Sequence, residues 1–130
     1  MACYIHPGAK DRCIFVFCEG DTPMPEMAVA SGEANGLLAA KHWRRVVVDL
    51  TGLISVPPAA ELFNFVSSLP GRLPSRARVA LVVRPEQTRH ARLAESAARN
   101  GGVRLAFFPD LKKAANWVKA VERDEFSYSK

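Results

Sequence analysis

The amino-acid sequence predicts a single α/β domain over residues 1–130, with the element order ββαβαβαβα and a mixed, mostly parallel sheet. The length of 130 residues is that of one ordinary domain. Two apolar runs at residues 2–7 and 12–20 flank a turn-forming segment at 8–11, which predicts a β-hairpin. From Arg44 onward, short β-branched runs alternate with amphipathic segments, which favours parallel strands joined by right-handed helical crossovers.

The first helix is predicted after the hairpin. Residues 21–26 combine a polar residue, two prolines and an acid, a pattern typical of a helix start. Residues 27–43 then carry apolar side chains at three-to-four spacing, namely Met27, Ala30, Ala34, Leu37 and Leu38. Gly32 and Gly36 each destabilise a helix by about 1 kcal/mol relative to alanine. We therefore expect this helix to be bent or broken.

The remaining elements follow in alternation. Runs rich in β-branched or aromatic residues predict buried strands at 46–50, 79–83 and 103–108. Amphipathic segments predict helices at 59–69, 85–99 and 111–121. Asp110 stands where the N-cap of the last helix belongs, and the polar tail from about residue 123 is expected to fray.

Composition excludes several classes of protein. Hydrophobic residues make up 48% and charged residues 24%, the balance of a soluble globular domain. No apolar run approaches the 18 or so residues of a membrane span, so we expect no membrane partner. The first residues lack the apolar stretch of a signal peptide, and we expect a cytoplasmic protein.

Cysteine and histidine usage predicts neither a metal site nor a cofactor. Cys3, Cys13 and Cys18 are an odd set close to the N-terminus, a poor disulfide framework. Cys13 and Cys18 are five apart in a predicted strand, so they point to opposite faces and could not chelate one metal together. The histidines, at positions 6, 42 and 90, are far apart and none has a partner at zinc-ligand spacing. We expect three reduced cysteines that act as small hydrophobes.

Catalytic motifs are absent, so the sequence does not predict an enzyme. The strand ending at Asp49 is not followed by GxGxxG, and neither GxxxxGK[ST] nor GxSxG occurs in the chain. In a parallel sheet, sites form beyond the carboxyl ends of the strands. Asp49, Thr51, Ser55, Arg84 and Asp110 lie there. Each also has a structural interpretation: a backbone contact for Asp49, a turn for Thr51, a solvated Arg84, and a helix cap for Asp110.

Charge is strongly segregated along the chain, whose formal net charge is +5. Residues 13–40 hold four acids and no Lys or Arg, whereas residues 72–104 hold eight arginines and two acids. Arg89, Arg92 and Arg99 fall on one side of a predicted helix. They predict a surface for an anionic partner, a solvated face, or self-association with the acidic segment. No aromatic residues interleave with these arginines to stack bases, which argues against nucleic acid.

Three stretches together resemble a known family: RRVVVDLTGL at 44–53, the strand–helix–strand segment at 77–108, and FPDLKKAANWV at 108–118. They are similar to STAS-like domains (sulphate-transporter and anti-sigma-factor-antagonist), especially the stand-alone bacterial branch related to sporulation anti-sigma-factor antagonists. The resemblance implies a STAS-like fold, with four to five strands and helices packed mainly on one face. It also implies a binding or regulatory module rather than an enzyme.

The resemblance departs from the family pattern at one point. Antagonists of the family carry a phosphorylated serine motif at the start of the helix that follows the VVVDL-like strand. The matching stretch here is SVPPAA at 55–60, with prolines in place of the hydroxyl. Ser55 or Thr51 could substitute only if the loop register shifts. We therefore expect no phosphoserine switch.

These observations favour a small non-enzymatic STAS-like regulatory or protein-interaction module. The alternative is a small-molecule or lipid-binding protein with a pocket for an apolar or anionic ligand at the carboxyl ends of the strands, since related lipid-transfer folds enclose apolar ligands. An enzyme built on the strand-end residues has no motif behind it. The candidate binding residues are Asp49, Thr51, Ser55, Arg84, Arg89 and Arg92. An exposed edge strand in the hairpin would also allow a homodimer.

Overall fold

The computed structural model describes residues 3–67, 72–74 and 76–128, with side chains as far as Ala120. Within these residues the elements follow the predicted order. The strands are β1 (Cys3–Gly8), β2 (Cys13–Gly20), β3 (Arg45–Leu53), β4 (Arg78–Val82) and β5 (Arg104–Phe108). The helices are α1 (Met24–Lys41), α2 (Ala59–Ser67), α3 (Thr88–Asn100) and α4 (Leu111–Tyr128), with a 3-10 turn, η2 (Pro85–Gln87), before α3.

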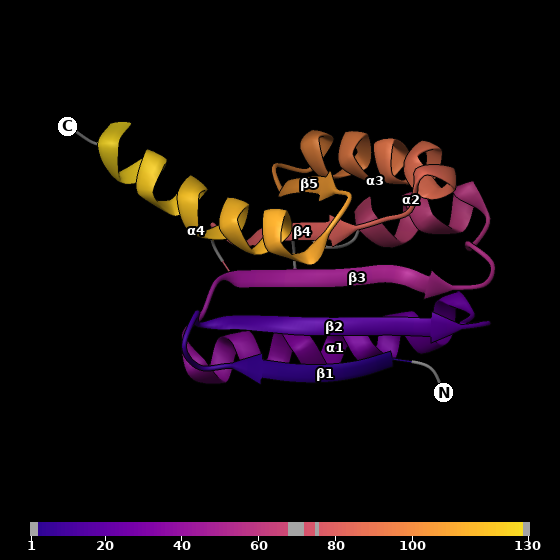
Figure 1. Ribbon diagram of the computed structural model, residues 1–130, viewed down its shortest axis with the longest axis horizontal. Helices are drawn as coiled ribbons and strands as arrows, with labels where there is room; N and C mark the ends of the chain where they lie inside the picture. Colours follow the sequence, from indigo (N-terminus) through magenta and orange to yellow (C-terminus); the bar gives the residue numbers. More distant parts are fainter. Residues whose placement is uncertain (1–2, 68–71, 75, 129–130) are drawn as a thin grey trace.

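The five described strands form one sheet in the order β1-β2-β3-β4-β5 (Figure 1). β1 pairs with β2 antiparallel, and every other neighbouring pair is parallel. This confirms the predicted hairpin and the mixed, mostly parallel sheet. Because β2 to β5 run in one direction, their carboxyl ends meet along one edge, where ligands bind in open α/β sheets.

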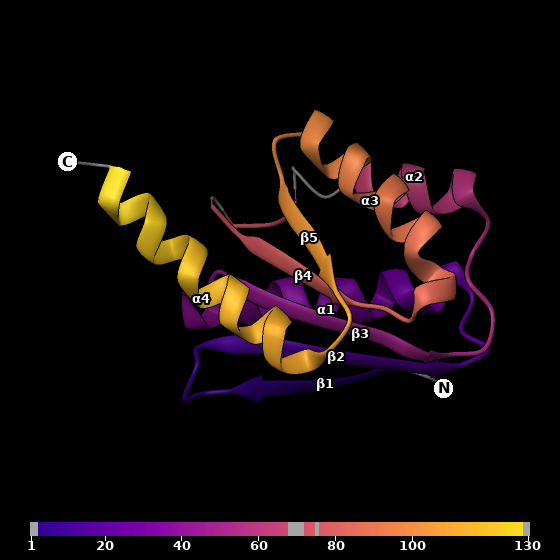
Figure 2. The same ribbon diagram turned by 45° about the horizontal axis from the view of Figure 1, so that its top comes forward.

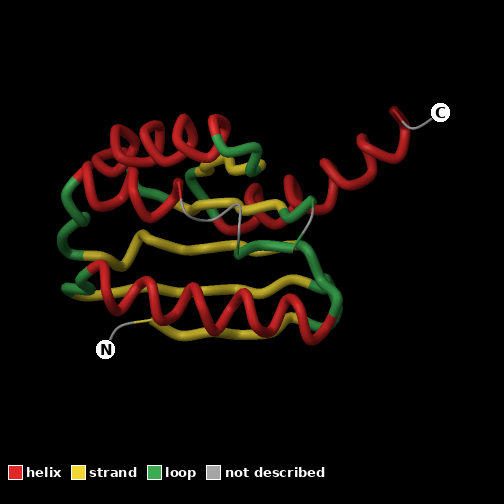
Figure 3. The backbone as a smooth tube through the Cα atoms, turned by 180° about the vertical axis from the view of Figure 1, so that it is seen from behind, coloured by secondary structure: helices red, strands yellow, loops and turns green. Residues whose placement is uncertain are grey.

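Helices cover the two faces of the sheet unequally. α1, α2 and α3 lie on one face, and α4 crosses the other (Figures 1 and 2). The view from behind shows α1 running along the β1–β3 side, with α2 and α3 beside each other over the opposite side (Figure 3). This confirms the STAS-like expectation that the helices pack mainly on one face.

Each face of the sheet has its own apolar core. The larger cluster includes Ile14, Leu38 and Leu81 and lies beneath the three helices. The smaller cluster, beneath α4, consists of Cys13, Val47, Ala80, Val82, Ala114 and Val118. Cys18 belongs to the first cluster and Cys13 to the second, so the prediction that they point to opposite faces is confirmed.

β4 is buried at all five positions because helices cover both of its faces. Arg78 begins this strand with only 2% of its side chain exposed. It donates hydrogen bonds to the backbone oxygens of Arg76 (3.0 Å) and Ala77 (3.4 Å). Arg78 is one of the eight arginines of the basic stretch 72–104, which we interpret as favouring an acidic partner surface. Arg78 cannot contribute to such a contact, because its guanidinium lies inside the domain.

α1 is continuous over 18 residues, so the expectation of a broken helix is wrong. Gly32 and Gly36 are exposed, with open space where a Cβ would lie. The helix is held by burial of Ala30, Ala34 and Leu38 against the sheet. Tertiary packing of this apolar stripe outweighs the low helix propensity of two glycines.

Two further boundaries differ from the prediction. β3 continues to Leu53, beyond the predicted end at residue 50, and its register against β2 shifts between Phe17 and Glu19. α4 begins as predicted after Asp110, whose Oδ1 accepts a hydrogen bond from the backbone N–H of Lys113 (2.8 Å), so the predicted cap is confirmed. The helix runs to Tyr128, and fraying of the tail from about residue 123 stays a prediction. The predicted helix end at 68–69 lies outside the described residues.

Candidate functional site

Three of the predicted strand-end residues come together at the carboxyl edge of the sheet. Asp49 and Thr51 lie on the last part of β3, and Arg84 follows β4. β3 and β4 are parallel neighbours with Asp49 opposite Val82. Arg84 therefore lies two residues beyond the partner of Asp49, within reach of Thr51.

Asp49 organises the end of β3. Its Oδ1 accepts two hydrogen bonds from Thr51, one from the backbone N–H (2.9 Å) and one from the hydroxyl (2.6 Å). This is the backbone contact that the structural interpretation of Asp49 predicts. Because the Thr51 hydroxyl is already donated to a carboxylate, it is held in one orientation.

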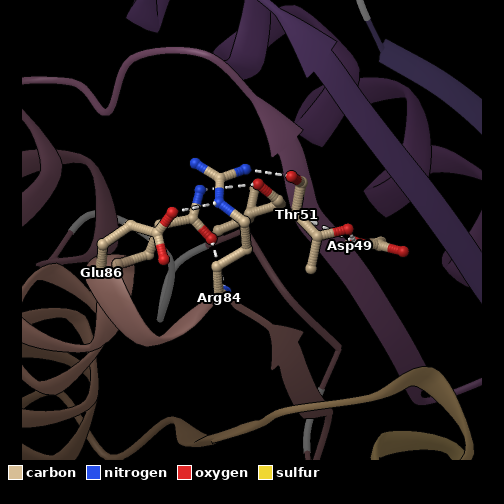
Figure 4. A network of polar contacts seen from close by, with 6 residues as sticks. Asp49, Thr51, Arg84 and Glu86 are labelled. Carbon is tan, nitrogen blue, oxygen red and sulfur yellow. Dashed lines mark hydrogen bonds and ion pairs between the residues drawn. The ribbon is translucent and has the colours of Figure 1, made fainter.

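Arg84 connects β3 to the turn that follows β4 (Figure 4). Its Nη1 donates to the carbonyl oxygen of Thr51, and its Nε forms an ion pair with Glu86 Oε2 at 2.9 Å. Hydrogen bonds from its own backbone N–H and from Arg84 lower the pKa of Glu86. Arg84 is thus a bridged side chain rather than the freely solvated one of the structural interpretation.

Gln87 completes the network, although its sequence context did not predict this role. Its side chain is only 3% exposed. Oε1 accepts a hydrogen bond from the backbone N–H of Arg84 (2.8 Å), and Nε2 donates to the carbonyl oxygen of Leu50 (2.8 Å). The amide therefore ties β3 to the start of α3. A polar residue directly after Pro85–Glu86 is the only sequence signal, and it does not reveal the contact with Leu50.

Ser55 has a different partner from the Asp49–Thr51–Arg84 group. Its hydroxyl donates to Asp21 Oδ1 (2.6 Å), and both side chains are exposed. This bond joins the loop after β2 to the loop after β3. A phosphate on Ser55 would face the carboxylate of Asp21, and like charges this close repel. Ser55 is in the loop that leads to Pro57 and Pro58, ahead of the first residue of α2, Ala59.

The segregated charges of the sequence become segregated surfaces. Arg89, Arg92 and Arg99 on α3 are all exposed, and Arg99 pairs with Glu95 at 3.5 Å. The acids of the N-terminal segment are exposed too, at Glu19, Asp21, Glu26 and Glu33. The end of β3 adds an exposed apolar side chain, Ile54, with a relative exposure of 78%. Arg89, near the start of α3, and Ile54, just after β3, both follow strand ends at the carboxyl edge of the sheet.

An apolar cavity of about 100 Å³ lies under the helical layer. It opens between the sheet and the helices α1 and α2, with Ser31 and Asn35 as its polar lining residues. A smaller cavity of about 30 Å³ lies nearer the carboxyl edge, beside Gln87 and His90. The larger of these two apolar cavities therefore lies below α1 and α2. The ligand-binding hypothesis places its pocket at the carboxyl ends of the strands, where the smaller cavity has room for only a water molecule or two.

Among the described residues, no three His, Cys, Asp or Glu side chains cluster as metal ligands would. No helix in the same part of the chain is both long and apolar enough to cross a membrane.

Comparison with solved structures identifies the class of fold. The chain is similar to an uncharacterised protein of the DUF3478 family with a SpoIIAA-like fold from Shewanella loihica PV-4, with a TM-score of 0.59 and 17% identity. It is equally similar to an anti-sigma factor antagonist from Mycobacterium paratuberculosis, with a TM-score of 0.60 and 20% identity. Each match covers 90% of this chain and 92% of the other. The domain therefore has the STAS-like, SpoIIAA-like fold that the sequence predicts.

Comparisons by sequence find no match. No protein-family model matches the chain, and no curated protein sequence matches it. At 17% and 20% identity, the solved structures establish the fold alone.

Proposed function

We propose that this protein is a non-enzymatic regulatory module that binds an acidic surface of a partner protein through the amino-terminal half of α3 and the adjoining end of β3. The fold is that of an anti-sigma factor antagonist. The observation that carries the proposal is the exposed arginine face of α3, a helix that begins at the same carboxyl edge of the sheet where Ile54 is exposed to solvent. Guanidinium groups bind carboxylates bidentately, and an apolar anchor ringed by charge is typical of a protein interface.

The internal contacts of the site support binding rather than catalysis. Asp49, Arg84 and Gln87 are each engaged with backbone or side-chain partners that fix the shape of the edge. Such a network holds Arg89, two residues after Gln87, at a defined place relative to β3. Asp49, Thr51 and Arg84 thus act as positioning residues, and Arg89 and Arg92 as partner-contacting residues.

The proposal includes operation without a phosphoserine switch. Thr51 donates its hydroxyl to Asp49, and Ser55 faces Asp21. Either hydroxyl, once phosphorylated, would lie against an existing carboxylate, which disfavours the modified state. Control of partner binding would then depend on the charge of α3 and its salt sensitivity. The protein would act in the cytoplasm of a bacterium.

A charge-reversal experiment tests the contact surface. The double variant Arg89→Glu/Arg92→Glu is compared with Lys112→Glu/Lys113→Glu, which reverses two exposed charges on α4 at the other face. Tagged proteins are incubated with the native cytosol, and bound proteins are quantified by mass spectrometry. We expect one partner to be retained by the wild type and by the α4 variant, and lost by the α3 variant. Equal retention by both variants would contradict the proposal.

Self-association through the same surface is tested with matched charges. If the partner is a second copy, the wild type sediments as a dimer and Arg89→Glu/Arg92→Glu as a monomer. Mixing that variant with Glu26→Arg/Glu33→Arg, which reverses exposed acids on α1, should then restore a heterodimer. A wild-type monomer at high concentration excludes self-association.

The apolar cavity favours a second candidate function, binding of a small apolar ligand. A space of about 100 Å³ lined mainly by apolar side chains can hold a few carbon atoms of a ligand. Native mass spectrometry of gently purified protein should then show an adduct. The adduct should disappear in Ala30→Leu, which places three more carbon atoms in the cavity. A bare protein mass in the wild type would argue against a ligand.

A further inference from the structure

Cys3 and Cys18 lie face to face in the hairpin. They are directly opposite partners in the antiparallel β1–β2 ladder. Their Sγ atoms are 2.7 Å apart, in hydrogen-bond contact. Both side chains contact the larger core cluster, Cys3 as a partly exposed residue and Cys18 as a buried one with 4% exposure.

The backbone already has the geometry that a disulfide needs. Directly opposed residues of an antiparallel pair have Cα atoms about 4.5 or 5.5 Å apart. Disulfides span Cα separations of about 4.4 to 6.8 Å. Bond formation would bring the sulfurs closer by only about 0.7 Å, to the usual S–S length. Rotation about the two Cα–Cβ bonds can supply that movement without shifting either strand.

The two thiols differ in a way that assigns them different roles. Cys3 is on the edge strand β1 and is partly exposed, so an oxidant can approach it from solvent. Cys18 is enclosed, and burial together with the hydrogen bond from Cys3 raises the pKa of its thiol. A partly exposed cysteine reacts first with a dissolved oxidant, and an adjacent buried thiol resolves the product.

Cys13 provides an internal comparison. It is completely buried in the other core cluster, on the opposite face of the sheet from Cys18. Burial raises the pKa of its thiol to about 12. Because the sheet separates it from the other two sulfurs, it can neither react first nor resolve a reaction of Cys3.

We propose that Cys3 and Cys18 are a redox-active pair that a peroxide converts reversibly into a disulfide across the β1–β2 hairpin. The Cys3 thiolate attacks one peroxide oxygen and the O–O bond breaks, which gives a sulfenic acid at Cys3 and, after protonation, one water from hydrogen peroxide. The Cys18 sulfur then attacks the Cys3 sulfur. The S–O bond breaks, and the second water leaves with the proton of Cys18. Two thiols are oxidised and one peroxide is reduced.

The bond would lock the edge of the sheet. β1 is paired with β2 on one side only in the described sheet, and singly paired edges open most readily. A disulfide between residues 3 and 18 would close a short loop. Cross-links that close loops of this size substantially lower the conformational entropy of the unfolded chain. We expect the midpoint of thermal unfolding to rise by about 10 °C on oxidation and to return when dithiothreitol is added.

The test uses the full chain and one equivalent of hydrogen peroxide. After oxidation, free thiols are alkylated in denaturant and the protein is digested without reduction. In the wild type we expect a peptide pair linked through Cys3 and Cys18, with Cys13 as the one alkylated cysteine. In Cys13→Ala we expect the same linked pair and no alkylated cysteine. Three alkylatable thiols after oxidation, or a bond to Cys13, would overturn the proposal.

Two variants separate the steps. Cys3→Ser, at the partly exposed position, should fold and form no bond. Cys18→Ala should leave a sulfenic acid on Cys3 that dimedone captures. If Cys18→Ala does not fold, the rate at which peroxide removes free thiols from Cys3→Ser tests the role of Cys3 instead. We expect this rate to be at least tenfold lower than in the wild type. Equal rates in Cys3→Ser and wild type would show that Cys3 is not the reacting thiol.

Discussion

Replacement of Gln87 by alanine tests whether the carboxyl edge of the sheet is held by one buried amide. Gln87 is the only described residue that bonds both the β3 carbonyl of Leu50 and the backbone N–H of Arg84. The change removes two hydrogen bonds and leaves two backbone groups without their partner. Each such group costs about 1 to 3 kcal/mol when it stays buried. Because Arg84 is partly exposed and can recruit water, we expect a total loss of about 2 to 4 kcal/mol.

Urea denaturation measures this loss through the unfolding midpoint, with the slope of the transition as a check that the unfolded state is unchanged. The matched control is Glu86→Gln, one residue earlier. It removes the charge of a solvent-exposed carboxylate that pairs with Arg84, and exposed pairs contribute little. A Gln87→Ala variant as stable as Glu86→Gln would refute the assignment of Gln87 as the link between β3 and α3.

A second variant at the same position separates hydrogen bonding from packing. Gln87→Glu keeps the size of the side chain and the oxygen that faces the N–H of Arg84. It replaces the donor that faces the Leu50 carbonyl with an acceptor. We expect it to be as unstable as Gln87→Ala at pH 7, and to recover when acid protonates the carboxyl and restores a donor. Instability that does not change with pH would indicate a packing defect instead.

Four further predictions concern stability. Gly36→Ala in α1 should raise the free energy of unfolding by about 1 kcal/mol, because its Cβ meets open space. Gly52→Ala should lower the free energy of unfolding by about 1 to 3 kcal/mol, because the new Cβ would lie 2.8 Å from Glu19 Cβ. A urea midpoint equal to that of the wild type in either glycine variant would contradict the prediction for that variant. Asp110→Ala should cost about 1 kcal/mol through loss of the cap, with helix content followed by circular dichroism. The Cys13 thiol has a pKa of about 12 in the folded state and 9.0 when unfolded, so above pH 9 only the unfolded state loses this proton. The free energy of unfolding should therefore fall by up to about 1.4 kcal/mol per pH unit above pH 9. In Cys13→Ala this fall should be shallower.

The order of the elements could be predicted because each depends on local sequence pattern. The β-branched run at 46–50 and the apolar spacing of the last helix require no knowledge of distant residues. Capping by Asp110 is local for the same reason, with donor and acceptor three residues apart. The resemblance to STAS-like domains supplied the placement of helices mainly on one face.

The contacts that the sequence did not predict are those between distant segments. Gln87 bonds Leu50 across 37 positions, and Ser55 bonds Asp21 across 34. The pairing of Cys3 with Cys18 depends on hairpin register, and a shift of one residue would point one sulfur to the other face. The continuity of α1 depends likewise on burial of Ala34 and Leu38 against the sheet. Helix propensities of the individual residues carry no information about this burial.

The placement of α4 has a consequence for how the chain acquires its structure during synthesis. All five strands precede α4 in the chain, yet α4 alone among the described helices covers the face that holds Val47 and Ala80. Until Ala114 and Val118 emerge and dock, the nascent sheet exposes an apolar face on which another nascent chain could stick. The domain therefore passes through a stage at which it is most exposed to aggregation, and that stage ends when α4 closes the second core.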